Sequence, residues 1–172
     1  MRNWNVQEKK TKKVGTEMKE VIGNLWDQSS KNPYWIVIPC NGFWKKDGTA
    51  IMGAGVAKEA ADLFPGLSAY FGGLLQKYGN IVLPLGSWGQ EEETLISFPT
   101  KQHWREPSNL RLIEQSCRQL YELWQETDNP YIITVFIPHV GCGYGGLSWD
   151  RVKPVLEKYF VNNQFIVVEK GE

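Results

Sequence analysis

The stretch Tyr34-Trp35-Ile36-Val37-Ile38-Pro39 (YWIVIP) is an unbroken apolar run about as long as one strand. Such a run is typical of a strand that is buried on both faces, because a strand with one wet face alternates apolar and polar residues. The run 131–138 (YIITVFIP) has the same character. Each run leads into a glycine-rich segment and then into a helix-forming segment. The sequence therefore predicts a mostly parallel sheet with helices on both faces.

The rest of the chain continues this alternation of strand and helix. Apolar residues at helical spacing predict a helix over 110–125, with Ser108 as its N-terminal cap. The other predicted helices cover 56–64, 67–78 and 149–159, and the other predicted strands cover 18–26, 81–85, 94–98 and 165–169. We expect a three-layer α/β/α sandwich with a mixed, mostly parallel sheet.

The length of 172 residues suits one domain, which we place at 18–172. Residues 1–17 are polar and carry Lys9, Lys10, Lys12 and Lys13 without a hydrophobic period, so we expect a peripheral N-terminal arm. A nucleic-acid role for these lysines is a possible alternative to a solvated arm.

Composition argues against several classes of function. The 19 basic and 19 acidic residues balance, which disfavours tight nonspecific binding to DNA. The cysteines Cys40, Cys117 and Cys142 lack a CxxC spacing, and His103 and His139 lie far apart, so neither a disulfide framework nor a metal site is expected. No apolar run approaches the roughly 20 residues of a membrane span. We expect a cytoplasmic monomer that uses no cofactor and no membrane.

The two glycine-rich segments are the candidate ligand site. Ligands of open α/β sheets bind beyond the carboxyl ends of the strands, and glycine lets the backbone approach them closely. Gly53-Ala54-Gly55-Val56 and 141–146 are therefore candidate diphosphate cradles, since N–H groups at a helix N-terminus attract phosphate. Plain turn glycines are the alternative. Neither segment has the Walker spacing, and the first lacks a full GxGxxG, which disfavours a nucleoside triphosphatase or a standard dinucleotide dehydrogenase.

The sequence resembles a known family at several of these positions. The succession Gly23-Asn24-Leu25, Asn41-Gly42, Met52-Gly53-Ala54-Gly55-Val56-Ala57 and Gly141-Cys142-Gly143 resembles the macro domains. The run 98–104 (FPTKQHW), followed by Ser108, Leu110, Ile113 and Glu114, and the segment Gly145-Gly146-Leu147 with Trp149 are similar to the DNA ADP-ribosyl glycohydrolase antitoxins and the related terminal ADP-ribose protein glycohydrolases.

The resemblance implies a pocket for ADP-ribose and an ADP-ribosyl glycohydrolase that acts on a DNA base or on protein, with single-stranded DNA as a possible partner. In that branch a lysine at the position of Lys101 attacks or polarises the anomeric carbon of the distal ribose, and an asparagine at the position of Asn41 hydrogen-bonds that ribose. Residues expected to bind ADP-ribose are Asn24, Leu25, Gly53, Ala54, Gly55, Val56, Thr100, His103, Gly141, Cys142, Gly143, Tyr144 and Gly145. Alternatives are a non-catalytic reader, a phosphatase or esterase acting on phosphorylated or acetylated ADP-ribose, and an unrelated α/β nucleotide-binding or interaction module.

The sequence also departs from the family pattern. Asn24 replaces the aspartate that commonly contacts adenine, and segment 141–146 has no acidic residue. Segment 43–48 (FWKKDG) is longer than the family leads us to expect, which suggests a substrate-facing flap or a surface loop. His103 and Trp104 are candidates to orient Lys101 or to stack on an extruded base, although core packing is the expected role of Trp104.

Overall fold

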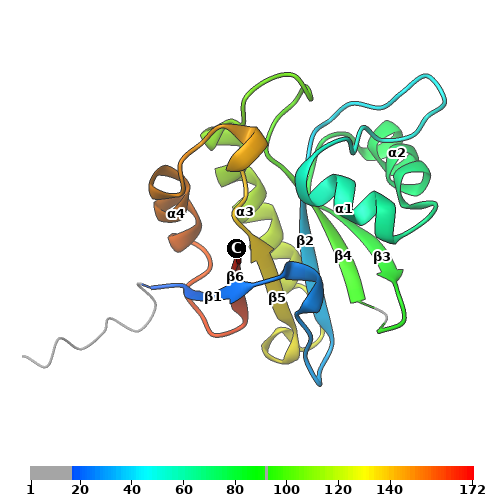
Figure 1. Cartoon of the computed structure of the whole chain (residues 1–172). Coiled ribbons are helices and arrows are strands. Elements are labelled where there is room, and N and C mark those ends of the chain that lie inside the picture. The colour runs from blue at the N-terminus through cyan, green and yellow to red at the C-terminus, as the bar shows by residue number, and fades with distance from the viewer. Residues whose placement is uncertain (1–16, 92) are drawn as a thin grey trace, which may run out of the picture.

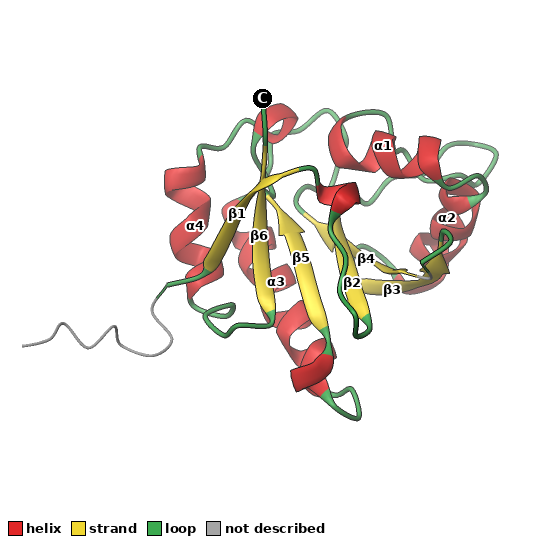
Figure 2. Cartoon of the chain, turned by 60° about the horizontal axis from the view of Figure 1, so that its bottom comes forward, coloured by secondary structure: helices red, strands yellow, loops and turns green. Residues whose placement is uncertain are grey.

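The computed structural model describes residues 17–91 and 93–172. Within these residues, six strands form one sheet in the order β1-β6-β5-β2-β4-β3 (Figures 1 and 2). The strands are β1 (Lys19–Gly23), β2 (Tyr34–Cys40), β3 (Leu83–Trp88), β4 (Glu93–Pro99), β5 (Thr134–Pro138) and β6 (Phe165–Lys170). Only β3, at one edge, runs antiparallel to its neighbour, so the prediction of a mixed, mostly parallel sheet is confirmed.

Helices cover both faces of this sheet, as Figure 2 shows. The helices are α1 (Gly55–Leu63), α2 (Leu67–Tyr78), α3 (Leu110–Gln125) and α4 (Trp149–Glu157), and short 3-10 turns lie at η1 (Leu25–Asp27), η2 (Pro130–Ile132) and η3 (Gly143–Gly145). Apolar residues of α1 and α2 pack in one core and those of α3 and α4 in another. The expected three-layer sandwich is thus the observed one.

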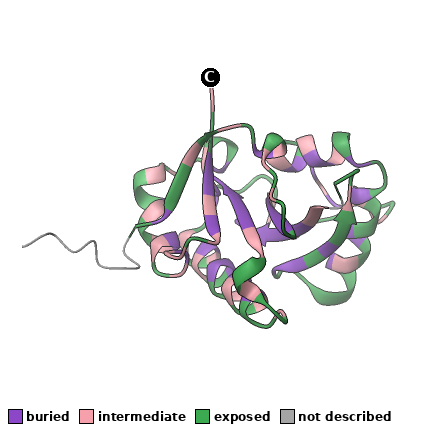
Figure 3. Ribbon diagram, turned by 90° about the horizontal axis from the view of Figure 1, so that it is seen from below, coloured by how far each residue is buried: buried purple, intermediate pink, exposed green. Residues whose placement is uncertain are grey.

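Strand β2 shows why an unbroken apolar run forms the centre of this fold. Ile36 and Ile38 face the core beneath α1 and α2, whereas Trp35 and Val37 face the core beneath α3 and α4. Successive side chains of a strand point to opposite faces, so a strand between two layers needs apolar residues at every position. All four side chains are buried, and the buried positions follow the central strands in Figure 3.

Four expectations about local structure were wrong. The cap of α3 is Asn109, whose Oδ1 accepts a hydrogen bond from the N–H of Leu112 (3.1 Å), while Ser108 is buried against the next loop. The segment containing Tyr131 forms the exposed turn η2, because Pro130 favours the first position of a helical turn. Strand β3 begins at Leu83, two residues later than predicted. Trp104 is 43% exposed and lies outside both cores.

The lysine-rich arm predicted over residues 1–17 lies outside the described residues, apart from Glu17. In the part of the chain that the structure describes, no helix is long and apolar enough to cross a membrane. The same residues contain no cluster of three or more His, Cys, Asp or Glu side chains that could hold a metal ion.

Candidate functional site

The predicted site residues gather at the carboxyl ends of the parallel strands. Because β1, β2, β4, β5 and β6 are parallel, their carboxyl ends lie on the same side. Asn24 directly follows β1, Asn41 follows β2, Thr100 follows β4, and Gly141 lies just beyond β5. The connections that leave β2, β4 and β5 project from the top of the sheet in Figure 1. Segments far apart in sequence therefore meet where the fold predicts a ligand.

The first glycine segment ends in an open helix N-terminus. Gly55, the first residue of α1, has φ +57°, a conformation that favours glycine. Ala54 precedes it in an extended conformation and has no side-chain acceptor that could cap the first N–H groups. Asn109 does cap α3 with its own side chain. The N-terminus of α1 is thus free to bind an anion, and Gly53 beside it faces open space.

The second glycine segment is held tightly against the start of α3. The N–H of Ser108 donates to the carbonyl of Gly145 (2.8 Å), and a methyl group on Gly145 would overlap the Ser108 hydroxyl. Gly141 has φ +76°, and a methyl group there would lie 2.6 Å from Cδ1 of Ile113. Gly141 is therefore favoured by its positive φ and Gly145 by its close contact with Ser108, and both glycines shape the path of the loop between them.

The two glycine segments meet at Tyr144. Its side chain is 80% exposed, and a methyl group on Gly55 would lie 3.8 Å from Cδ2 of the ring. This separation is ordinary van der Waals contact, so the ring lies beside the open N-terminus of α1. The structure thus brings together two segments that are about ninety positions apart in the printed sequence.

Asn41 organises the loop between β2 and α1. Its Nδ2 donates to the carbonyl of Ile51 (3.0 Å), and its Oδ1 accepts from the N–H of Phe43 (3.0 Å). The side chain is buried, with 9% exposure. A primary amide has a second N–H and a second oxygen lone pair, so these two bonds leave capacity for a ligand.

Lys101 follows β4 on a backbone that is fixed from three directions. Thr100 donates from its N–H to the carbonyl of Cys40 (3.0 Å), which joins the ends of β4 and β2. The N–H of Gly42 donates to the carbonyl of Gln102 (2.9 Å). Asn80 donates from Nδ2 to the carbonyl of Lys101 (3.2 Å) and to Oε1 of Gln102 (3.1 Å). Lys101 itself is half-buried.

Sequence reasoning missed Asn80. It follows Gly79 at the end of α2 and reads as an ordinary turn residue. Its role depends on a contact across 21 positions of the sequence, for which no local pattern exists. Among the described residues, its buried Oδ1 has no hydrogen-bond partner.

His103 is held by its neighbours. Its Nδ1 accepts from the N–H of Arg105 (3.0 Å), and its ring meets the ring of Phe43 edge to face, with 4.4 Å between ring centroids. The Phe43 loop and the segment after Lys101 therefore contact each other. The guanidinium of Arg105 lies over the ring of Trp104, 4.6 Å from its centroid.

The predicted adenine contact, Asn24, also supports the local backbone. Its Oδ1 accepts from the N–H of Trp26 (3.0 Å), and Leu25 is buried in the core beneath α1. The indole of Trp26 donates to Glu59 of α1 (2.8 Å), which ties η1 to that helix. Asn24 therefore lies on the α1 side of the site.

Cys142 lies between Gly141 and Gly145. Partial burial raises the pKa of its thiol, and its Sγ is 3.6 Å from the carbonyl oxygen of Val140. At neutral pH the side chain is thus a neutral thiol, and the segment Gly141 to Gly145 presents backbone rather than charge.

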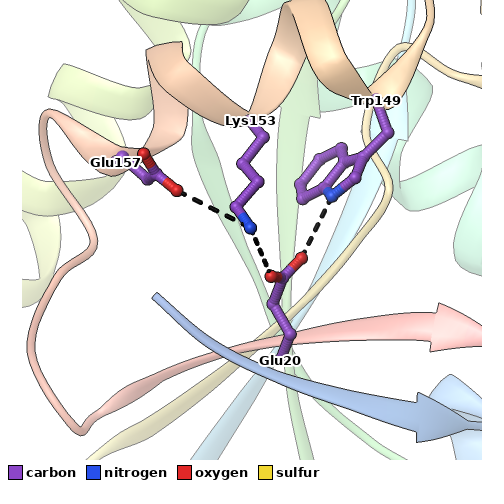
Figure 4. Close-up of polar contacts among 4 residues, drawn as sticks. All are labelled: Glu20, Trp149, Lys153 and Glu157. Carbon is purple, nitrogen blue, oxygen red and sulfur yellow. Dashed lines mark hydrogen bonds and ion pairs between the residues drawn. The ribbon is translucent and has the colours of Figure 1, made fainter. Parts of the chain in front are cut away.

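A polar cluster joins β1 to α4 (Figure 4). Glu20 of β1 accepts hydrogen bonds from the indole of Trp149 (3.0 Å) and from Lys153 (2.7 Å), and Lys153 also contacts Glu157 at 3.8 Å. Partial burial acts to raise the pKa of Glu20, but these two hydrogen bonds and the nearby positive charge of Lys153 together lower the pKa. His139 stacks face to face on Trp149 at 3.9 Å, and burial lowers its pKa.

No protein-family model matches the chain. Among curated proteins it is similar to the DNA ADP-ribosyl glycohydrolase of Mycobacterium tuberculosis, with 39% identity over 66 residues, which is 38% of this chain and 18% of the relative. It is also similar to that of Thermus aquaticus, with 31% identity over 113 residues, which is 63% of this chain and 30% of the relative. The chain thus spans less than a third of the length of these curated relatives.

Solved structures define the class of protein. The macrodomain of Mycobacterium tuberculosis DarG matches with a TM-score of 0.68 and 24% identity, over 92% of this chain and 99% of that chain. The chain therefore has the macro domain fold. The Thermus aquaticus DarG macrodomain matches with a TM-score of 0.67, 25% identity and coverage of 91% and 99%. Thermosipho africanus DarTG in complex with ADP-ribose matches with a TM-score of 0.67, 21% identity and coverage of 92% and 43%.

Proposed function

We propose that this chain binds ADP-ribose at the carboxyl edge of its sheet and hydrolyses the bond between ADP-ribose and a DNA base. The observation that carries the proposal is the meeting of the two glycine segments at Gly55 and Tyr144, beside Asn41 and Lys101. The names of the curated relatives support DNA as the acceptor, and the Thermosipho africanus structure supports ADP-ribose as the ligand.

The glycine segments are suited to the diphosphate. The N-terminus of α1 offers uncapped N–H groups, and the second segment supplies backbone without a competing carboxylate. Tyr144 is placed to cover the diphosphate and the ribose, because its ring is exposed and lies next to Gly55. Binding by backbone dipoles explains how a chain with no net charge could hold a ligand with two negative charges.

The adenine end is assigned to Asn24 and Leu25. The Oδ1 of Asn24 accepts one hydrogen bond, from the N–H of Trp26, and can accept a second. With its NH₂ group as donor, the side chain can both donate to and accept from adenine. Unlike an aspartate, it adds no charge, so we expect adenine preference to arise from hydrogen-bond geometry alone.

The reacting end is assigned to Asn41 and Lys101. Asn41 would orient the distal ribose with the amide capacity left after its two loop bonds. Lys101 would attack or polarise the anomeric carbon. In the overall reaction the bond from that carbon to the base breaks, one water supplies the new hydroxyl, and the base regains a proton. The products are free ADP-ribose and unmodified DNA.

The test compares wild type with Lys101→Ala on ADP-ribosylated single-stranded DNA and on ADP-ribosylated protein. Binding of free ADP-ribose is measured alongside by calorimetry, and Lys77→Ala, an exposed lysine on α2, is the matched control. We expect Lys101→Ala to bind ADP-ribose but to release it at least a hundredfold more slowly, as for loss of a group that acts in the transition state. Binding without turnover by wild type would instead identify a reader, and failure to bind ADP-ribose would refute the site.

A further inference from the structure

Beside the proposed reaction site, aromatic and cationic side chains form an exposed surface that the hydrolysis does not require. Phe43, Trp44 and Trp104 are 39%, 45% and 43% exposed. Single exposed apolar side chains are normal, but several large rings in two touching segments mark a binding surface. We call the group formed by Phe43, His103, Trp104 and Arg105 the aromatic shelf.

The shelf is continuous because each member contacts the next one in space, from Phe43 to His103, Trp104 and Arg105. The Phe43 and His103 rings lie 4.4 Å apart, and the His103 and Trp104 rings lie 5.7 Å apart with an angle of 21° between their planes. Arg105 lies over the ring of Trp104 at 4.6 Å. Flat rings together with a guanidinium plane are the groups on which nucleobases stack.

Backbone hydrogen bonds hold the segment that carries Phe43 in place. Lys45 and Thr49 pair through a backbone hydrogen bond of 2.7 Å, and Gly48 donates back to Lys45 at 2.9 Å, which closes a tight turn. Ala50 donates to Ser68 of α2 at 2.8 Å. Segment 43–50 is thus a hairpin-like loop fixed on α2, and its two lysines project from a defined position.

Cationic side chains follow the shelf residues in sequence, Lys45 and Lys46 after Phe43 and Arg105 after Trp104. Within the described part of the chain, no ion pair holds Lys45, Lys46 or Arg105. The nearby carboxylate of Asp47 accepts hydrogen bonds from the N–H and hydroxyl of Thr49, which lower its pKa and direct it to its own turn. Exposed cations next to exposed rings match a strand of alternating phosphates and bases.

We propose that the aromatic shelf binds the single-stranded nucleic acid on one side of the modified nucleotide and so positions that nucleotide at Lys101. This inference rests on the proposed function. His103 is two residues beyond Lys101, which places its backbone at most about 7 Å away. A base stacked on the shelf would therefore be a near neighbour of the reacting base. Bases in a duplex are not open to such stacking, so the preferred partner is a single strand.

The first measurement is binding of an unmodified, fluorescein-labelled single strand of about ten nucleotides, followed by anisotropy. We expect Trp104→Ala to weaken binding about tenfold, because one base–aromatic stack is lost, and Trp104→Phe to keep most of the affinity. Tyr131→Ala is the control. Tyr131 is 73% exposed, but it precedes the amino end of β5, and the site lies beyond the carboxyl ends of the strands. Equal binding by Trp104→Ala and Tyr131→Ala would overturn the proposal.

Salt dependence tests the cationic part of the surface. For a single strand, the slope of log K against log salt is about −0.7 for each phosphate neutralised. Replacing both Lys45 and Lys46 with alanine should reduce the magnitude of this slope by about 1.4. The same slope in wild type and double variant would show that these lysines do not contact the strand and would contradict that part of the proposal.

A second substrate pair separates failure of the shelf from failure of the proposed function. Hydrolysis is compared on an ADP-ribosylated oligonucleotide and on an ADP-ribosylated mononucleoside. If the shelf acts as proposed, Trp104→Ala raises KM for the oligonucleotide about tenfold and leaves the mononucleoside and free ADP-ribose unaffected. Hydrolysis of both substrates with no effect of Trp104→Ala on KM for the oligonucleotide would refute the shelf but leave the proposed hydrolase activity intact. Strand binding through Trp104 without turnover would refute the hydrolase but keep the shelf, and release from protein alone would overturn both assignments to DNA.

Discussion

Two adjacent glycines of α2 should respond in opposite ways to the same substitution. Gly72 is buried and packs against the loop that carries Phe43. Gly73 is exposed, and a methyl group added there would meet none of the described atoms within 4 Å beyond its chain neighbours and the nearby backbone of its own helix. Both lie in the interior of the helix, where alanine is favoured over glycine by about 1 kcal/mol. Their intrinsic helix propensities therefore cancel in the comparison, and only the surroundings differ.

The magnitude follows from what the methyl group would meet. At Gly72 it would overlap the carbonyl oxygen of Gly48 and lie 2.7 Å from the N–H nitrogen of Ala50. These are backbone atoms, so relief requires the whole loop to move. Such overpacking costs about 1–3 kcal/mol and offsets the helix gain. We expect Gly73→Ala to stabilise by up to about 1 kcal/mol and Gly72→Ala to destabilise by up to about 2 kcal/mol.

Urea unfolding followed by tryptophan fluorescence measures both variants, with the free energy of unfolding obtained by linear extrapolation. In a domain of this size the two melting temperatures should differ by about 2–12 °C. The same substitution at Gly72 should also weaken single-strand binding, since the displaced loop carries Phe43 and Lys45. A Gly72→Ala variant as stable as Gly73→Ala would refute the reasoning, because it would show that the loop does not rest on the helix as described.

Two further predictions concern the site and the polar cluster. Replacing Asn80 with alanine removes the donor to the Lys101 carbonyl (3.2 Å). We therefore expect kcat on ADP-ribosylated DNA to fall about five- to tenfold, while calorimetry shows nearly unchanged affinity for ADP-ribose. An equal loss of kcat and of affinity would make Asn80 a general structural residue. Acid should destabilise the fold, because burial lowers the pKa of His139 and the unfolded chain therefore takes up its proton first as pH falls. The unfolding free energy should decrease between about pH 7.5 and 5.5, and His139→Phe, which keeps a ring against Trp149, should flatten that decrease. A slope unchanged in His139→Phe would assign the effect to other groups.

Much of the fold follows from local signals in the sequence. Strands buried on both faces give unbroken apolar runs, and helix α2 begins at Leu67 and ends at Tyr78 as predicted because Gly79 can adopt the positive φ, +82°, that terminates it. The wrong cap of α3 has a physical cause. Ser108 and Asn109 are both good caps, and only the packing of Gly145 against Ser108 assigns the task to Asn109.

The site was less accessible to sequence reasoning because its geometry depends on long-range contacts. The residues that follow the strands were predictable from the order of strands and glycine segments. The contact of Tyr144 with Gly55, the support of Lys101 by Asn80 and the meeting of Phe43 with His103 were not. Trp104 shows the limit most directly, since hydrophobicity predicts burial and the structure leaves it 43% exposed. An apolar residue that fails this expectation is informative about function.

The two parts of the proposed substrate would be bound by different forces. ADP-ribose would be held by backbone N–H groups and by a helix N-terminus, whose positions are fixed by Gly141, Gly145 and the fold of α1. The nucleic acid strand would be held by exposed rings and by exposed cations such as Lys45 and Lys46. Added salt should therefore weaken binding of the modified strand more than binding of free ADP-ribose. Because the chain has no net charge, this difference would arise from local arrangement and not from a general attraction to polyanions.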